Sequence, residues 1–300
     1  MSRNLAAHAA VDRATRPSTL QATLNYVAPN PERPVFHTSD QTRSRLVLDP
    51  HPVAIRDARE LAGPSIDREG FLVIRQPMPP WDLRDQSVRD GAYLVHLQDL
   101  VQSALGAAKV ITNTSVIRLP GPKAFQVPVL MVHCDFTLKS ARRLLGECMD
   151  HAKGHDDGMA ETNTLIAQSV ESVSEADRRY SRVLALNAWR PISEPPHDVP
   201  LAVCRRDSLA PGDIQVADFI EEVQGEEPYR DELSLCHYNS SHEWYSFSDM
   251  TPDELLLFAG YDFNDPEHYR VMHSAFRDSA CPPGVAGRAS VEVRMFAFFE

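Results

Sequence analysis

The chain has 300 residues, 43% of them hydrophobic and 24% charged, which suits one large folded core and argues against general disorder. Its formal net charge is −12 at pH 7, so nucleic acid and anionic membrane surfaces repel it. No apolar run approaches the roughly 20 residues that a membrane span needs. Residues 1–10 lack the apolar stretch of a secretory signal. We therefore predict a cytoplasmic protein that binds neither nucleic acid nor membrane.

The five cysteines predict free thiols rather than a zinc ribbon or a disulfide framework. Their number is odd, and no two of them form a CxxC pair. Free thiols are typical of a reducing compartment. The GxSxG, P-loop and GxGxxG motifs are also absent, which removes the commonest hydrolase, nucleoside-triphosphatase and dinucleotide-binding interpretations.

In the first half of the chain, a polar N-terminal stretch is followed by segments with strand-like and helix-like apolar patterns. Residues 1–45 are polar and contain several prolines, so we expect them to wrap around a core formed by later residues. Gly70–Ile74 is a β-rich run that predicts a strand. Trp81–Leu105 has apolar residues at helical spacing, and Val110–Arg118 predicts another strand.

The middle of the chain alternates between apolar and polar segments. Val127–Val132 is nearly all apolar, which predicts a strand buried on both faces. Leu138–Asp150 predicts a helix. Residues 154–180 are polar, and we expect a lid or an edge helix there.

The last third of the chain again contains short runs of residues that favour strands. Thr251-Pro252-Asp253-Glu254 predicts a helix start, because Thr can cap, Pro suits the first helical position and Glu can reach back to a free N–H. The short β-like runs are Val183–Trp189, Pro200–Cys204, Leu233–Tyr238, Trp244–Phe247 and Ser290–Phe299.

Many short strands with few long helices, and no alternation of the two, predict a mainly β fold with flanking helices. An antiparallel sandwich or a jelly roll fits this pattern. No internal repeat and no linker rich in Gly, Ser or Pro divides the sequence. We therefore expect a single domain over residues 1–300.

The strongest local signal for chemistry is Met131-Val132-His133-Cys134-Asp135. Residues two apart in a strand point to the same face, so His133 and Asp135 can present an imidazole and a carboxylate to one ion. A second histidine would complete a 2-His-1-carboxylate triad, which leaves three positions open and selects non-haem Fe(II) for oxygen chemistry. An isolated HxD is more often a hydrogen-bonded pair, but the preceding apolar residues would bury the base of this site.

His273 is the preferred third ligand. It precedes Arg288-Ala289-Ser290, which opens the last predicted strand. Arg288 and Ser290 lie on one face of that strand, where a guanidinium and a hydroxyl suit a carboxylate. The order HxD, distal His, RxS is more specific than any one of its parts, although a satisfied core histidine and a solvated arginine remain the plain alternatives.

Other histidines compete for the third position. His242 is the main rival and His237 the next, but neither is followed by RxS. His151 and His155 are four apart, as in a zinc-protease helix. The glutamate of HExxH is missing between them, so we interpret this pair as solvated.

Beyond these motifs, most of the chain resembles the CmcJ/NvfI-type oxygenases, a family also described as gibberellin-desaturase-like or AsaB-like hydroxylases and desaturases. The matching segments are Leu24–Tyr26, Ile55–Arg59, Asp67–Phe71, His133–Asp135, Asn187–Pro191, Pro200–Cys204, Tyr238-Asn239, His242, Trp244-Tyr245, Met250–Glu254, Tyr261-Asp262, His273–Phe276 and Arg288–Arg294.

This resemblance implies a double-stranded β-helix core, a jelly roll of the cupin-like kind, with Fe(II), 2-oxoglutarate and O2 as cofactors. Carried over by position, it makes His133, Asp135 and His273 the metal ligands. Arg288 and Ser290 would hold the distal carboxylate of 2-oxoglutarate. Weaker candidates for the cosubstrate or substrate pocket are Arg190 and Asn187.

The sequence departs from the family pattern in three places. Arg205 replaces a usual acidic residue, Phe263 replaces a usual Ser, and the segment Gly154–Tyr180 is long. None of the three involves the expected ligands, so the expected metal chemistry stands. The departures do mean that no substrate is carried over from the family.

The function predicted is oxidation of an unactivated C–H bond in a small natural-product-type substrate, by hydroxylation, desaturation or oxidative cyclisation. Succinate and CO2 would be released. Halogenation is disfavoured, because Asp135 fills the position that a halide needs. The alternatives are a non-catalytic cupin-like protein that binds a metal or small molecule, and a zinc hydrolase, for which no general base is placed. A homodimer is left open.

Overall fold

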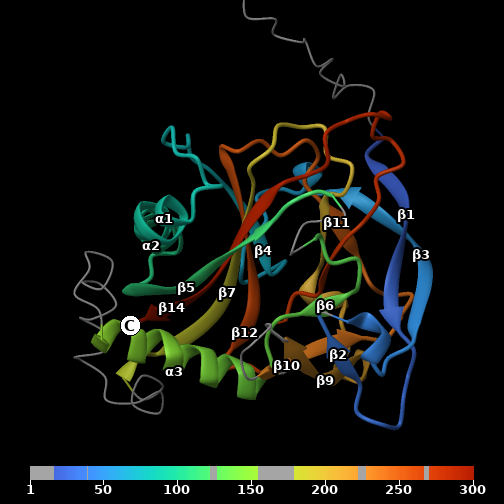
Figure 1. Ribbon diagram of the computed structural model, residues 1–300, viewed down its shortest axis with the longest axis horizontal. Helices are drawn as coiled ribbons and strands as arrows, with labels where there is room; N and C mark the ends of the chain where they lie inside the picture. The colour runs from blue at the N-terminus through green and yellow to red at the C-terminus, as the bar shows by residue number, and fades with distance from the viewer. Residues whose placement is uncertain (1–16, 39, 122–126, 155–178, 222–227, 267–269) are drawn as a thin grey trace, which may run out of the picture.

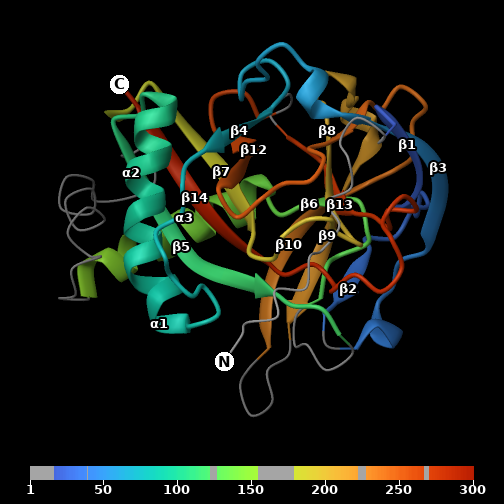
Figure 2. The same ribbon diagram turned by 90° about the horizontal axis from the view of Figure 1, so that it is seen from above.

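The computed structural model describes residues 17–38, 40–121, 127–154, 179–221, 228–266 and 270–300. Two sheets make up most of it (Figures 1 and 2). The larger has nine strands in the order β1-β3-β11-β8-β13-β6-β10-β9-β2. The smaller has five, in the order β4-β12-β7-β14-β5, and all its neighbours are antiparallel.

The strands in the middle of the larger sheet are short, and so is β2 at one end. The nine strands are β1 Thr19–Val27, β2 Val35–His37, β3 Leu48–Asp57, β6 His133–Cys134, β8 Leu201–Cys204, β9 Ile214–Glu221, β10 Tyr229–Cys236, β11 Trp244–Ser246 and β13 His273–Ala275. The pairs β3–β11 and β2–β9 are parallel, and the other neighbours are antiparallel.

The smaller sheet is built from longer apolar strands: β4 Phe71–Arg75, β5 Lys109–Arg118, β7 Arg182–Pro191, β12 Glu254–Asp262 and β14 Ser290–Phe299. Every residue of β12 is buried, as expected for a strand covered on both faces. Its continuous apolar run is therefore a consequence of its central place, between β4 and β7.

Two long helices flank the sheets. Helix α2 (Leu94–Leu105) lies against the smaller sheet on the side away from the larger one (Figure 2). Its Leu97 and Val101 pack with Leu186 of β7 and Val293 of β14. Helix α3 (Leu138–Gly154) packs on β10 of one sheet and β5 of the other. The shorter helical turns are α1 Gln86–Val88, the π turn Arg89–Tyr93, and the 3-10 turns Gln41–Arg43, Ala58–Glu60, Arg206–Ser208 and Pro211–Asp213.

Two predicted elements are wrong. Thr251–Glu254 does not start a helix, because Leu255–Phe258 instead pair with β4 as part of β12. The expected contact exists, since Thr251 N donates to Glu254 Oε2 at 3.1 Å, but it closes a turn. Val127–Val132 is not a strand. Pro128 lacks a donor for a sheet ladder, Val127 is 47% exposed, and only an isolated bridge forms at Met131.

The helix predicted at Trp81–Leu105 begins later, at Gln86. Gly91 interrupts it with φ −107° and ψ −110°, which separates a π turn from α2. Part of the predicted wrapping segment, Thr19–Val27, forms β1 at one end of the larger sheet. Residues 1–16 of that segment, and 155–178 of the predicted lid, lie outside the described residues. The single domain stays a prediction.

Candidate metal centre

Three side chains that can bind a metal converge in the larger sheet: His133, Asp135 and His273. Their ligand atoms lie within 4.8 Å of one another. β6 and β13 are neighbours there (Figure 2). His133 and His273 are directly opposite each other in register. His133 Nε2 lies 3.8 Å from Asp135 Oδ1, as expected when residues two apart in an extended chain point the same way.

Both histidines are oriented by the carbonyl two residues before them. His133 Nδ1 is 2.7 Å from Met131 O, and His273 Nδ1 is 3.5 Å from Val271 O. A proton on Nδ1 that is donated to the carbonyl leaves the Nε2 lone pair free for a metal. Burial, together with the neighbouring His273, lowers the pKa of His133 to about 4. Burial also lowers the pKa of His273, so both rings are neutral at pH 7.

Asp135 is the charged member of the cluster. Burial opposes its ionisation, but Arg294 and the two histidines outweigh burial and hold the pKa of Asp135 well below its usual range. Asp135 Oδ1 accepts a hydrogen bond from Arg294 at 3.1 Å, and Oδ2 accepts one from Asn187 at 2.6 Å. An ionised carboxylate and two neutral imidazoles form the donor set that suits Fe(II) and leaves one face open.

The partners of Asp135 come from the other sheet. Arg294 on β14 lies opposite Asn187 on β7. Ser290, Glu292 and Arg294 are alternate residues of β14 and therefore share one face. That face is the one that meets Asp135, so the candidate site lies between the two sheets.

Arg288 lies two residues before β14, and Ser290 is the first residue of that strand. Both side chains are polar and buried. Arg288 is 2% exposed and its guanidinium lies 5.1 Å from the centre of the Trp189 ring. Its Nε and one terminal nitrogen, and Ser290 Oγ, have no hydrogen-bond partner among the described residues. Burial and nearby Arg118 lower the pKa of Arg288 to about 9. Such unpaired donors are costly to bury and suit an anionic ligand.

Of the two weaker candidates, the structure brings only Asn187 to the cluster. Arg190 is three residues further along β7 and so points to the opposite face. There it donates to Pro252 O at 2.6 Å and stands over the Tyr93 ring, next to α2. The structure thus places Arg190, which was expected in the cosubstrate or substrate pocket, in the layer between the smaller sheet and α2.

The rival histidines lie elsewhere. His242 is held between the hydroxyl of Tyr26 and Asp213 Oδ2, each at 3.1 Å. His237 Nδ1 is 2.8 Å from Val27 O. His155 lies outside the described residues.

Sequence reasoning missed Glu292 and Gly260, and it did not place Arg294 beside Asp135. Glu292 Oε1 accepts from Asn187 at 2.7 Å, next to Asp135. A Cβ on Gly260 would lie 2.1 Å from the Phe136 ring, so only glycine lets Phe136 sit directly after Asp135 as it does. The signal that could have placed Glu292 and Arg294 was their spacing in the last strand, because residues two apart share the face of Ser290.

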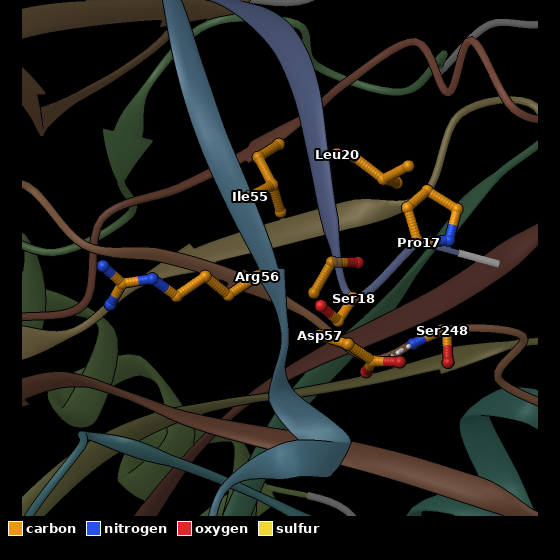
Figure 3. Close-up of a pocket in the computed structure, with 8 residues that line it drawn as sticks. Pro17, Ser18, Leu20, Ile55, Arg56, Asp57 and Ser248 are labelled. Atoms are coloured by element: carbon orange, nitrogen blue, oxygen red, sulfur yellow. Dashed lines mark hydrogen bonds between the residues drawn. The ribbon is translucent and has the colours of Figure 1, made fainter.

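A hollow elsewhere on the surface carries no part of this cluster. It lies beside β1 and β3 and is lined by Pro17, Ser18, Leu20, Ile55, Arg56, Asp57, Ser246 and Ser248 (Figure 3). Its charged groups are already engaged, since Arg56 donates to the hydroxyl of Tyr245 at 3.2 Å and Asp57 accepts from Arg59 N at 3.0 Å.

Comparison with known proteins places this arrangement in a family. The model of the Oxidoreductase/YMDC permease-like domain family matches residues 24–298. The chain belongs to this oxidoreductase family. Within the described residues, the oxidoreductase has no helix long and apolar enough to cross a membrane.

The relatives of this oxidoreductase confirm the resemblance predicted from the sequence. It is 26% identical over 268 residues to the Fe(II)/2-oxoglutarate-dependent dioxygenase nvfI of Aspergillus novofumigatus, covering 86% of this chain and 87% of nvfI. It is 27% identical over 299 residues to the hydroxylase/desaturase efuI of Hormonema carpetanum, covering 96% and 97%.

A solved structure confirms the predicted fold class. The iron and alpha-ketoglutarate-dependent endoperoxidase NvfI superposes with a TM-score of 0.77 at 24% identity, covering 94% of this chain and 98% of that one. The mainly β fold with flanking helices and a jelly-roll core is therefore as predicted.

Proposed function

We propose that this oxidoreductase is an Fe(II)- and 2-oxoglutarate-dependent oxygenase that oxidises an unactivated C–H bond of a small natural-product-type substrate, releasing succinate and CO2. The observation that carries the proposal is the convergence of His133, Asp135 and His273. Two neutral imidazoles and one carboxylate leave coordination positions for a bidentate cosubstrate and for O2. The names of nvfI and efuI support the same activity.

The residues of the site fit both groups. His133 and His273 would offer Nε2, because their Nδ1 atoms face backbone carbonyls. Arg288 and Ser290 would bind the distal carboxylate of 2-oxoglutarate, which would satisfy their unpaired buried donors. Bound iron and 2-oxoglutarate supply the activation of O2 and the removal of hydrogen from the substrate carbon.

The chain's own contribution is binding, orientation and exclusion of water. Burial keeps the histidines neutral at pH 7 and strengthens each charge interaction around Asp135. The Arg288 guanidinium lies over the Trp189 ring, which helps to hold it in place for a charge-assisted contact with a carboxylate. The printed name of efuI, a hydroxylase/desaturase, supports hydroxylation or desaturation as the outcome, whereas NvfI is named an endoperoxidase.

The compartment and assembly belong to the proposal as well. The five free cysteines, four of them buried, are consistent with the reducing cytoplasm. A homodimer stays a prediction, and light scattering on the purified protein measures it.

The proposal is tested by following succinate formation from 2-oxoglutarate under air with Fe(II) and ascorbate. We expect turnover by the wild type and none by His133→Ala or Asp135→Ala, each of which removes a metal ligand. A wild type that binds iron but never consumes 2-oxoglutarate contradicts the proposal and favours the non-catalytic, cupin-like alternative.

A further inference from the structure

The two oxygens of the Asp135 carboxylate are held differently. Oδ1 lies 3.8 Å from His133 Nε2 and accepts from Arg294. Oδ2 accepts from Asn187 Nδ2 at 2.6 Å. The oxygen nearest the metal-binding nitrogen of His133 is therefore Oδ1, while Oδ2 is bound by an amide from the opposite sheet.

Asn187 is itself fixed in place. It has no exposed surface and sits in the middle of β7, paired with β12 on one side and β14 on the other. Its Nδ2 also donates to Glu292 Oε1 at 2.7 Å, so both amide hydrogens are used. A flipped amide would turn its carbonyl oxygen toward two carboxyl groups, which makes the observed orientation the favourable one.

Glu292 is held in turn between Arg118 and Asp135, and it also contacts the Asp135 carboxyl directly. Its Oε2 lies 3.8 Å from Arg118 Nε, and its side chain is buried on the same face of β14 as Arg294. The chain of contacts thus runs from Arg118 through Glu292 and Asn187 to Asp135. No other use of Glu292 follows from the proposed function.

The consequence concerns the binding mode of the carboxylate. An aspartate can bind a metal through one oxygen or through both, and the second oxygen would take a position that 2-oxoglutarate or O2 needs. A hydrogen bond to an ionised group biases such an equilibrium by roughly a factor of 10 to 100.

We propose that Asn187, oriented by Glu292, is a positioning residue that keeps Asp135 bound to the metal through Oδ1 alone and so keeps the cosubstrate positions open. This inference rests on the proposed function. It assigns Asn187 and Glu292 an effect on cosubstrate binding that is separable from metal binding itself.

The test uses the full-length protein with Co(II), which resists oxidation by air. Calorimetry gives the affinity for Co(II) and then the affinity of the Co(II)-loaded protein for 2-oxoglutarate. For Asn187→Ala we expect Co(II) affinity within about threefold of wild type or tighter, and 2-oxoglutarate affinity lower by about tenfold or more.

Two variants separate orientation from packing. Glu292→Gln keeps an acceptor oxygen for Asn187 and should stay near wild type, whereas Glu292→Leu removes it and should behave as Asn187→Ala. Gln98→Leu is the matched control, because Gln98 is also buried and donates to Thr112 on the far side of the smaller sheet. If Asn187→Ala does not fold, Glu292→Leu carries the same test.

The inference is overturned if Asn187→Ala and Glu292→Leu bind 2-oxoglutarate as wild type does. It is equally overturned if they lose Co(II) affinity as severely as His133→Ala. Asn187 would then be needed for metal binding itself, and not for keeping Asp135 bound through one oxygen. A wild type that binds Co(II) but not 2-oxoglutarate is a different result, and it contradicts the proposed function.

Discussion

Burial has opposite consequences for the two kinds of ligand in the cluster. It keeps the rings of His133 and His273 unprotonated, which a metal ligand requires. It also penalises the charge of Asp135, but the Arg294 guanidinium beside it holds the pKa of that carboxyl well below its usual range. The three side chains are thus ready to bind a cation without first losing a proton at pH 7.

The lowered pKa of His133 predicts a pH dependence of stability in the metal-free protein. The unfolded chain binds a proton on this ring below about pH 6.5, whereas the folded chain does so only near 4. The unfolded state therefore gains protons first, and the free energy of unfolding falls as pH drops from about 6.5 to 4. Urea unfolding in the presence of a chelator measures this.

The matched variant for that measurement is His133→Gln, which cannot titrate in this range. Its free energy of unfolding should fall less than that of wild type over the same window. Equal slopes in both proteins would mean that His133 is not held neutral by the fold.

Arg288 and Arg190 offer a matched pair of buried arginines for cosubstrate binding. Arg288→Ala should raise the 2-oxoglutarate concentration needed for half-maximal rate on the order of 10- to 100-fold, because it removes a charge-assisted contact. Arg190→Ala should leave that requirement near wild type, since Arg190 faces α2. Steady-state kinetics with varied 2-oxoglutarate measure both.

The reverse pattern, with Arg190 controlling the requirement and Arg288 not, would contradict the placement of the cosubstrate. Sequence reasoning reached Arg288 through RxS, whereas Arg190, also an expected pocket residue, lies on the other face of β7 from Asn187. Glu292 was missed, and Arg294 was not placed beside Asp135, because a charged residue in a strand carries no sign of its partner until the opposite strand is known.

At the scale of elements, close packing behind the cluster limits what Gly260 can become. A Cβ there would meet the Phe136 ring at 2.1 Å, and Phe136 directly follows Asp135. Gly260→Ala should therefore lower the free energy of unfolding by about 1–3 kcal/mol and weaken metal binding. Gly212→Ala is the control, since its Cβ would meet nothing within 4 Å.

Chemical denaturation and metal titration of the two glycine variants check this together. Should Gly260→Ala match Gly212→Ala in both, Phe136 has room to move and does not fix Asp135.

The elements themselves were predictable where one pattern dominated. Val183–Trp189 and Ser290–Phe299 are strands as expected, because their apolar runs fit the middle of a sheet covered on both faces. Thr251–Glu254 failed because local capping chemistry was outweighed by the pairing of Leu255–Phe258 with β4. β13 was missed because its residues, His273, Ser274 and Ala275, include no β-branched residue and only one that is apolar.

At the scale of the molecule, the site exists because two sheets meet. The larger sheet supplies His133 and His273 as directly opposed residues, and the smaller one supplies Asn187, Glu292 and Arg294. The sequence predicted the ligands through HxD spacing and the fold through family resemblance. It could not predict the second set, because the contact between sheets depends on tertiary packing that no local pattern encodes.

The central claim is that the three ligands hold Fe(II) with 2-oxoglutarate chelated to it, and anaerobic titration tests this most directly. Fe(II) and 2-oxoglutarate are added without O2, and the weak visible charge-transfer band of the chelate is followed. We expect the band in the wild type and its loss in His273→Ala, with the His242→Ala protein retaining it. A wild type that binds Fe(II) with no band, or a His273→Ala protein that keeps it, would contradict the account.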